Sequence, residues 1–398
     1  MVNHVYRESI NRNAADGLWT EHVDLNSIQS TPAVILDEVT ATRNISRWAD
    51  SISKAGVSCR PHIKGHKTVE LAKAQLRAGA VGFEVSRLRE IKFLINSGID
   101  VEFVLSWIHY KPRMWDDVAR LNAKGHRIIV DVDSIDLLKG YQQAAQRHAT
   151  IIPVRIQVDS GLRGCTTTSM LEMCSFAAVD KNIELWGLTA YRSFYNRDES
   201  RNWTPFDVIG RQEAAFLASC REQITETLKI DTLKILCGST ATTGGSLAID
   251  GVTEVTGGSY VLNDWGLAQM GVCNVAEIAV AVVATVMQAN PDGIKIDAGS
   301  EIFGRWDPYP GIDHPVSAST ADGILGFVAV NGQESHSNDQ SYVKREIKAG
   351  DRLIVFPSHV SELVNLPGHF FVRDEEGIGP EQWQRLSTGL YDPEDAII

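Results

Sequence analysis

Two lysines and two histidines lie within the six residues His62–Lys67, in the segment Arg-Pro-His-Ile-Lys-Gly-His-Lys that begins at Arg60. A lysine on a rigid strand end, crowded by other cations, has a lowered amine pKa, and its neutral amine can attack an aldehyde. Lys64 is therefore a candidate nucleophile. Taken alone, the segment also fits a solvated basic loop.

An arginine between glycines and a tyrosine form a second group of candidates. In Gly161-Leu162-Arg163-Gly164 the glycines allow a sharp turn, so that the guanidinium of Arg163 can point back toward the preceding strand. Tyr191 follows the next apolar run and offers an aromatic ring to a flat ligand. Each residue alone also fits an ordinary role, Arg163 in a surface turn and Tyr191 in packing.

Two loops rich in glycine and hydroxyl residues could bind a phosphate group. One is Gly238-Ser239-Thr240-Ala241-Thr242, and the other is Gly258-Ser259-Tyr260. Such loops present backbone N–H groups and hydroxyls to an anion. Either loop alone is weak support for a phosphate site.

Alternating strand and helix patterns must position these residues. The apolar runs predict eight strands: Val57–Arg60, Val81–Val85, Val101–Leu105, Arg127–Val132, Pro153–Val158, Leu185–Ala190, Lys234–Cys237 and Glu254–Thr256. Apolar residues at spacings of three and four predict helices between them: Val69–Ala78, Leu88–Asn96, Met114–Ala123, Ile135–Arg147, Met170–Val179 and Arg211–Leu228. Eight parallel strands with helical crossovers predict an α/β fold of the (β/α)8 TIM-barrel type.

The barrel brings the candidate residues to one face, because each follows the carboxyl end of a strand. The loops after the seventh and eighth strands form the recurrent phosphate site of such barrels. A phosphate cradle, a reactive lysine, an arginine and an aromatic ring together suit pyridoxal 5'-phosphate (PLP). Its phosphate anchors the ring, Lys64 forms the Schiff base, and Arg163 faces the pyridine nitrogen.

After about residue 270 the sequence pattern changes from alternating strands and helices to β-rich runs, which predicts a second domain. Three β-rich runs separated by Gly, Pro and Asp turns predict a mostly antiparallel β domain: Val275–Met287, Gly293–Asp297 and Arg352–Phe356. We expect an N-terminal extension over 1–28, a PLP-binding barrel over 29–270 and a β domain over 271–398 that contributes to the active site. The early run 32–36 is strand-like and could join the β domain.

From these motifs the sequence resembles the PLP-dependent fold-type III enzymes of the D-threonine aldolase and D-serine dehydratase group, relatives of alanine racemase. The resemblance covers roughly residues 30 to 372. It implies that Lys64 carries PLP, that Arg163 meets the pyridine nitrogen and that Tyr191 lies near the cofactor. It also implies that the two loops bind the phosphate through Gly238, Ser239, Thr240, Thr242, Gly258, Ser259 and Tyr260.

The resemblance further implies a divalent metal (Mn, Zn or Mg) that polarises the substrate's 3-hydroxyl. The family's loop carries His-x-Cys or His-x-Asp, whereas this chain has His359 and Ser361. Serine is a poor ligand for such metals. Three interpretations stay open: His359 holds the metal with Glu362 or water, His359 acts as acid or base without a metal, or the scaffold serves another reaction. Further substrate-contact candidates are Lys67, Arg192, Arg305, Glu334 and His336.

We therefore predict a PLP-dependent lyase that cleaves a D-3-hydroxy amino acid to glycine and an aldehyde by a retro-aldol reaction. The alternatives are a D-serine or D-3-hydroxyaspartate dehydratase and an amino-acid racemase. A racemase needs a second base, for which the sequence offers no candidate. A non-catalytic PLP carrier is disfavoured, because the β domain exceeds what a bare barrel needs.

The amino-acid composition argues against several other classes of protein. The net charge of −12 argues against nucleic acid or an anionic membrane surface as a partner, since both require a basic surface. No apolar run reaches the length of a transmembrane helix, and the N-terminus lacks the apolar core of a signal peptide. We expect a cytoplasmic enzyme with reduced cysteines. The family resemblance suggests a homodimer.

Overall fold

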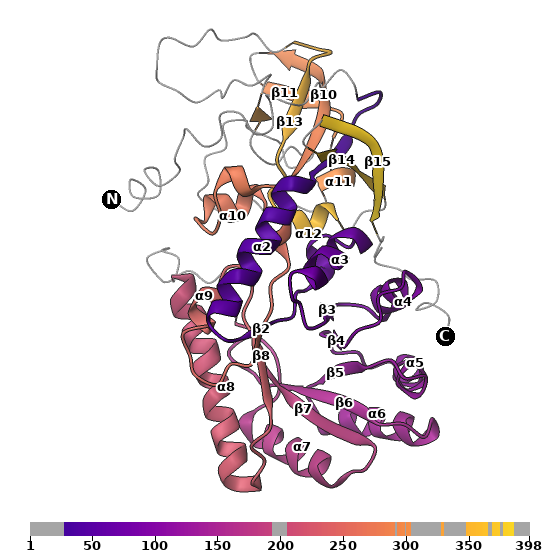
Figure 1. Cartoon of the computed structure of the whole chain (residues 1–398), viewed down its shortest axis with the longest axis vertical. Coiled ribbons are helices and arrows are strands. Elements are labelled where there is room, and N and C mark those ends of the chain that lie inside the picture. Colours follow the sequence, from indigo (N-terminus) through magenta and orange to yellow (C-terminus); the bar gives the residue numbers. More distant parts are fainter. Residues whose placement is uncertain are drawn as a thin grey trace. The chain divides into compact units, whose positions relative to one another are not determined.

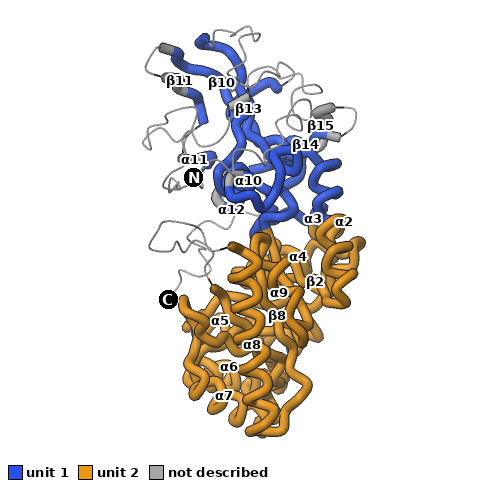
Figure 2. The backbone as a smooth tube through the Cα atoms, turned by 90° about the vertical axis from the view of Figure 1, so that its left-hand side faces the viewer, with its two compact units in different colours: residues 1–46, 64–71, 259–398 blue, residues 47–63, 72–258 orange. Residues whose placement is uncertain are grey.

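The structure is a computed structural model of the chain (Figure 1). It describes residues 28–192, 205–290, 293–298, 300–303, 328–329, 348–364, 368–374 and 377–385. Contacts divide the chain into two compact units, coloured separately in Figure 2. The barrel unit consists of Arg47–Ile63 and Ala72–Gly258. The β unit includes Lys64–Leu71, the residues up to Ser46 and those from Ser259 onward.

Eight parallel strands form the sheet of the barrel unit, in the order β2-β9-β8-β7-β6-β5-β4-β3. They are β2 (Ser58–Cys59), β3 (Phe83–Val85), β4 (Phe103–Leu105), β5 (Ile128–Val132), β6 (Ile152–Gln157), β7 (Ile183–Thr189), β8 (Lys234–Cys237) and β9 (Glu254–Val255). All eight predicted strands are present. The middle strands are buried along their whole length, as expected for parallel strands covered by helices.

Hydrogen bonds past the end of β2 close this sheet. The Val81 N–H donates to the carbonyl of Cys59, and the Glu84 N–H donates to that of Pro61. His62 then pairs in parallel with Glu84. These bonds join the first and last strands of the order, which confirms the predicted barrel.

Helices cover the outside of the barrel strands (Figure 1). An amphipathic helix buries one face, as in α6, where Leu137, Leu138 and Tyr141 are buried. The covering helices are α3 (Val69–Arg77), which the contacts divide between the units, α4 (Leu88–Asn96), α5 (Pro112–Ala123), α6 (Ile135–Arg147), α7 (Thr167–Val179) and α8 (Phe206–Leu228). All six predicted helices are present, several with earlier starts than predicted.

The β unit contains the second sheet, in the order β12-β13-β10-β1-β14-β15, with β11 paired to β10. Its strands are β1 (Ala33–Asp37), β10 (Val280–Asn290), β11 (Gly293–Ile296), β12 (Val328–Ala329), β13 (Arg352–Val355), β14 (Gly368–Asp374) and β15 (Gly377–Arg385). The sheet is antiparallel except where β1 pairs with β14. The early run 32–36 thus joins this sheet as β1, paired with β10 on its other side.

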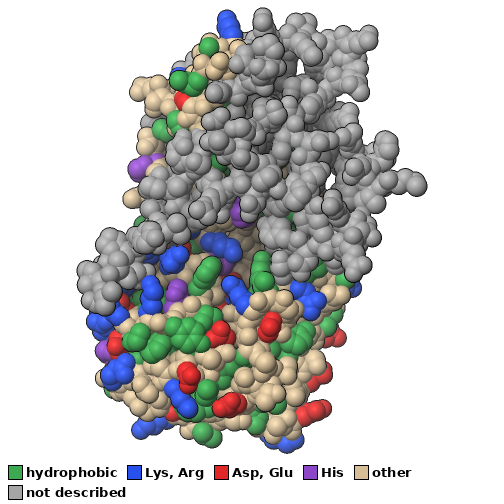
Figure 3. Space-filling model, turned by 180° about the vertical axis from the view of Figure 1, so that it is seen from behind, with side chains coloured by type: hydrophobic (Ala, Val, Ile, Leu, Met, Phe, Trp, Pro, Cys, Tyr) green, Lys and Arg blue, Asp and Glu red, His purple; other side chains and the backbone are tan. Residues whose placement is uncertain are grey.

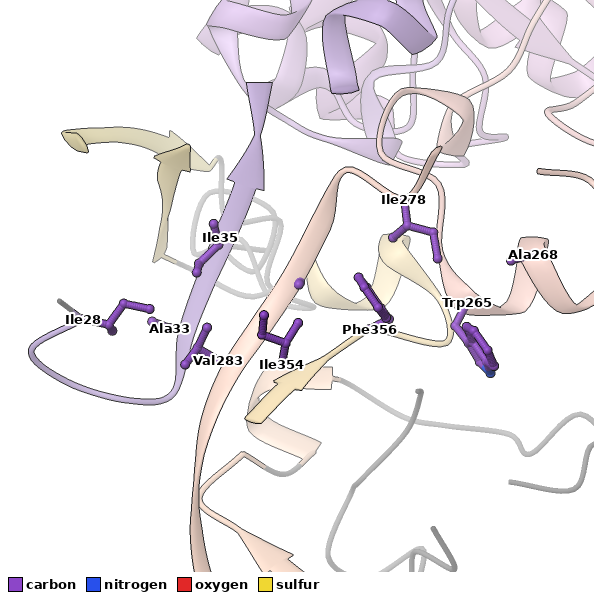
Figure 4. Close-up of a cluster of buried hydrophobic side chains, with 10 residues drawn as sticks. Ile28, Ala33, Ile35, Trp265, Ala268, Ile278, Val283, Ile354 and Phe356 are labelled. Carbon is purple, nitrogen blue, oxygen red and sulfur yellow. The ribbon is translucent and has the colours of Figure 1, made fainter. Parts of the chain in front are cut away.

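Apolar side chains from distant parts of the sequence form the core of the β unit (Figure 4). Ile35 of β1, Val283 of β10 and Ile354 of β13 pack with Trp265 and Phe356. Trp265 begins α10 (Trp265–Gln269), and Phe356 leads into α12 (Val360–Leu363). The core therefore fixes the loop that carries His359.

The barrel unit's surface mixes charges of both signs. On the face in Figure 3, Lys and Arg side chains are interspersed with Asp and Glu over the described part of the barrel. Among the described residues, no helix is both long and apolar enough to cross a membrane.

Candidate active site

Lys64 is the one exposed side chain among the described residues 61–68. It lies in a short 3-10 turn, Ile63–Gly65, five residues after the end of β2. Its neighbours are buried: Ile63, His66 and Lys67 are 1%, 0% and 3% exposed. Anchored on both sides, the segment presents a single amine from a fixed backbone.

The backbone around Lys67 is unusual. Lys67 has φ +56°, in the left-handed region that L-residues seldom adopt. The Thr68 N–H donates to Nδ1 of His66 at 3.2 Å, which closes the turn next to it. Strain of this kind concentrates at functional sites. The segment is therefore built for one conformation rather than as a solvated loop.

The Arg163 guanidinium lies against two aromatic rings in the barrel unit. Its Cζ is 5.4 Å from the centroid of the Tyr191 ring and 5.8 Å from that of Trp107. Arg163 itself is exposed. Gly164 has φ +122°, and a Cβ there would lie 2.6 Å from the backbone nitrogen of Asp159. The turn needs this glycine, and it points the arginine back toward the ends of β4 and β7.

The loop after β8 is tied into the barrel end by hydroxyl groups. Oγ of Ser239 and Oγ1 of Thr242 lie 2.9 Å apart. Oγ1 of Thr243 donates to the carbonyl of Ser239 at 2.8 Å and to that of Thr256 at 3.1 Å. Thr256 follows β9, so the loop after β8 is bonded to the backbone just beyond β9.

The backbone of Gly238 forms the turn that starts this loop. Gly238 has φ +93°, and a Cβ would lie 2.8 Å from Oγ1 of Thr243. Its N–H donates to a carboxylate oxygen of Glu213 at 2.9 Å. The conformation that only glycine tolerates well thus explains the residue at this position.

The second loop begins with Gly258 at the end of the barrel unit and continues in the β unit. Ser259–Val261 form a 3-10 turn in which Tyr260 is buried. The Asn263 N–H donates to the carbonyl of Ser259 at 2.6 Å. This segment leads directly to Asp264.

A buried carboxylate holds the loop of His359 within the β unit. Oδ2 of Asp264 accepts the N–H of Val360 at 3.0 Å and lies 3.5 Å from Nδ1 of His359. Oδ1 accepts the N–H of Leu267 and caps α10. The Trp265 N–H donates to the carbonyl of Pro357 at 2.9 Å. The His359 side chain is 39% exposed, while that of Asp264 is 2% exposed.

This arrangement fits an oriented acid or base. A carboxylate beside Nδ1 favours the N–H form of that nitrogen and leaves Nε2 as the reactive atom. Asp264 also stabilises the positive charge that the imidazole gains when it accepts a proton.

The donors for the implied metal fit poorly. His359 is followed two residues later by Ser361, whose hydroxyl is buried and finds no hydrogen-bond partner among the described residues. A neutral hydroxyl does not replace the thiolate or carboxylate that these metals prefer. Nor do the described residues contain a group of three His, Cys, Asp or Glu side chains that could hold a metal ion.

The other candidates are divided between described and undescribed parts of the chain. Lys67 is buried, and Nη1 of Arg192 donates to Oε1 of Gln212 at 3.0 Å. Arg305, Glu334, His336 and the side chain of Glu362 lie outside the described residues.

Two buried acidic residues, Glu213 of the barrel unit and Asp264 of the β unit, were not predicted as site residues from the sequence. Glu213 occupies a core position of α8, four residues from Ile209 and four from Leu217. A carboxylate at such a position is a readable signal, because buried charges need a specific partner. Asp264 precedes Trp265 at the start of a helix, which is a capping signal.

Comparisons with known proteins agree with this architecture. The model of the alanine racemase N-terminal domain matches residues 36–262. The chain belongs to this family. Within it, the chain falls in the PLP fold-type III group whose members include D-threonine aldolase and D-serine dehydratase.

Two relatives show how the likeness extends along the chain. The D-threo-3-hydroxyaspartate dehydratase of Delftia sp. is 30% identical over 280 residues, which cover 68% of this chain and 71% of that enzyme. The D-threonine aldolase of Arthrobacter sp. is 27% identical over 378 residues, which cover 90% of this chain and 93% of that enzyme.

A solved structure of the Delftia dehydratase superimposes with a TM-score of 0.76 at 24% identity, over 90% of this chain and 98% of that one. This likeness establishes the fold. The relatives act as aldolases and dehydratases, so the family supports a PLP-dependent enzyme.

Proposed function

We propose that this protein is a PLP-dependent lyase that cleaves a D-3-hydroxy amino acid to glycine and an aldehyde. The observation that carries the proposal is the pairing of Asp264 with His359, 3.5 Å apart, beside a serine where the family places a metal ligand. A retro-aldol reaction begins with removal of the proton from the 3-hydroxyl, and an oriented imidazole can perform that step without a metal.

The residues that would hold the cofactor have suitable chemistry. Lys64 provides the amine, Arg163 the cation for the pyridine nitrogen and Tyr191 a neighbouring ring. The two loops provide backbone and hydroxyl groups for the phosphate, through Gly238, Ser239, Thr240, Thr242, Gly258, Ser259 and Tyr260. When bound, PLP supplies an electron sink that stabilises negative charge at the substrate's Cα.

In the proposed reaction, Nε2 of His359 accepts the proton of the 3-hydroxyl. The Cα–Cβ bond breaks, its electron pair stays on Cα, and the hydroxyl oxygen becomes the carbonyl of the aldehyde. Asp264 offsets the charge of the protonated His359. Cα then gains one proton in place of the one that His359 removed from the hydroxyl. Glycine leaves, and no oxidant or reductant is consumed.

A dehydratase is the second candidate, because the Delftia relative of that activity aligns over 71% of its length. Here Lys64 would take the proton from Cα, and the 3-hydroxyl would leave Cβ as hydroxide with the electron pair of the C–O bond. Departure of hydroxide is harder without a metal. The donor set around Ser361 therefore favours the aldolase.

A substrate panel tests the choice. The purified protein, loaded with PLP, is incubated with D-threonine, D-threo-3-hydroxyaspartate, D-serine and the matching L-amino acids. Glycine plus an aldehyde supports the aldolase. Ammonia plus a 2-oxo acid supports the dehydratase. Bound PLP without turnover of any substrate would refute both.

A further inference from the structure

Glu213 is a buried carboxylate on the inward face of α8, which runs alongside the end of the barrel sheet (Figure 1). Its residue is 2% exposed. Burial raises the pKa of this carboxyl to about 7, even though two backbone N–H groups and Arg192 oppose the rise. A carboxylate kept in so unfavourable a place requires a specific function or partner.

The two oxygens of Glu213 bind the ends of two neighbouring strands. Oε2 accepts the N–H of Arg192 at 2.5 Å, directly after Tyr191 and β7. Oε1 accepts the N–H of Gly238 at 2.9 Å, directly after β8. Glu213 is therefore a bridge between the segment that carries Tyr191 and the loop that carries Ser239 and Thr242.

This bridge begins where the β ladder stops. The pairing of β7 with β8 covers Gly187 with Lys234 and Leu188 with Ile235. One further bond follows, from the hydroxyl of Thr189 to the carbonyl of Leu236. Beyond it, the two bonds of Glu213 supply the next link between the strand ends.

Close packing keeps α8 in place for this role. At Gly210 an added Cβ would lie 2.0 Å from the carbonyl oxygen of Thr242, and at Gly245 one would lie 2.0 Å from that of Asp207. The start of α8 therefore touches the loop after β8 backbone to backbone. Glu213 lies one turn beyond Gly210 on the same face.

We infer that Glu213 is a positioning residue for the cofactor. It holds the loop Gly238–Thr242 in place to bind the phosphate, and it holds the segment that carries the Tyr191 ring against Arg163. The inference rests on the proposed cofactor site. Glu213 need not touch the cofactor, because its two bonds go to the backbone of the loops that do.

The variant Glu213→Gln is the direct test. It keeps the size of the side chain but replaces one acceptor oxygen with an NH2 donor, which then faces a backbone N–H. Loss of one buried hydrogen bond should destabilise the position of the phosphate loop and lower the PLP affinity about tenfold or more. The readouts are the dissociation constant of PLP, from its visible absorbance, and the melting temperature of the PLP-free protein.

Two further variants make the test decisive. Glu222→Gln changes an exposed carboxylate on the same helix and should leave PLP affinity unchanged. Glu213→Asp keeps the charge but is too short to reach both N–H groups, so its PLP affinity should lie between those of wild type and Glu213→Gln. This variant serves if Glu213→Gln does not fold.

Several outcomes would overturn the inference. A lower melting temperature with unchanged PLP affinity in Glu213→Gln and Glu213→Asp would make Glu213 a purely structural residue. If Glu222→Gln lost as much PLP affinity as Glu213→Gln, the cause would be the removal of a negative charge from α8 and not the loss of hydrogen bonds. If the wild-type protein binds PLP but cleaves no substrate, the proposed function fails, but the role of Glu213 in PLP binding can still be measured.

Discussion

Oδ2 of Asp264 lies 3.5 Å from Nδ1 of His359 and accepts the N–H of the following residue, Val360. One buried carboxylate oxygen thus fixes both the backbone and the ring of the histidine loop. In the proposed reaction, this relationship would orient His359 as the base, two residues before Ser361.

Replacing Asp264 with Asn should lower kcat by about 10²- to 10⁴-fold, because the amide favours the wrong tautomer of the histidine and no longer offsets its positive charge. The PLP absorbance should persist. The double variant with His359→Ala should be no less active than His359→Ala alone, because both changes disable the same pair of residues. Losses that multiply in the double variant would mean that Asp264 acts independently of His359.

Removal of divalent metals should leave the activity unchanged. His359 and Ser361 offer one imidazole and one neutral hydroxyl, too weak a set for tight binding of Zn or Mn. Activity is measured after dialysis against a chelator and after return of each metal. As a control, Ser361→Asp recreates the His-x-Asp pattern and should gain a response to added metal. A loss of wild-type activity that metal restores would contradict this prediction.

Much of the barrel could be predicted because central strands such as β5 are mostly apolar runs, which is typical of parallel strands buried on both faces. The strands β14 and β15 could not. The sequence of β15 contains Gly, Pro, Glu and Gln with little apolar alternation. It is paired along β14, whose own partner β1 lies at the other end of the chain.

For the candidate site, residue types predicted Lys64, Arg163 and His359, but not the buried carboxylates that bond to the neighbouring loops. Glu213 bonds to residues 21 and 25 positions away, and Asp264 bonds to Val360 at a separation of 96. A single sequence carries local spacing, and it does not specify which distant backbone N–H a buried carboxylate will meet.

Lys64→Ala should abolish the visible absorbance of lysine-bound PLP and reduce activity to background, since the other lysine of the segment, Lys67, is buried. Lys73→Ala, an exposed lysine on the next helix, is the matched control and should retain the band. Borohydride reduction followed by peptide mapping should place the label on Lys64. A label on Lys67 instead would reassign the cofactor lysine.

Glu213 should make the protein less stable as pH rises from about 4.5 to 7. Its pKa is raised from 4.5 to about 7 in the folded state. In that window the folded state binds more protons than the unfolded state, so the free energy of unfolding falls with rising pH. A shift of this size corresponds to about 3 kcal/mol. Urea titrations at several pH values should show a flatter profile for Glu213→Gln. Parallel profiles for the two proteins would contradict the assignment.

Arg155 supports the barrel from within. Its Nε donates to Oδ1 of Asp131 at 2.6 Å and its Nη2 to Oε1 of Glu84 at 2.7 Å, and all three side chains are buried. Burial by itself raises the pKa of Glu84, but Arg155 and His62 outweigh it and lower the value to about 2. Arg155 is therefore a shared partner of both carboxylates.

Arg155→Met should lower the free energy of unfolding by about 3–5 kcal/mol, because it leaves buried charge uncompensated. The control is Arg127→Met. Arg127 also meets two carboxylates, Glu102 and Glu184, but its side chain is 46% exposed. Exposed ion pairs contribute at most about 1 kcal/mol. The free energy of unfolding of both variants is measured by urea titration at neutral pH. Similar losses of unfolding free energy in the two variants would mean that burial does not set the strength of the Arg155 network.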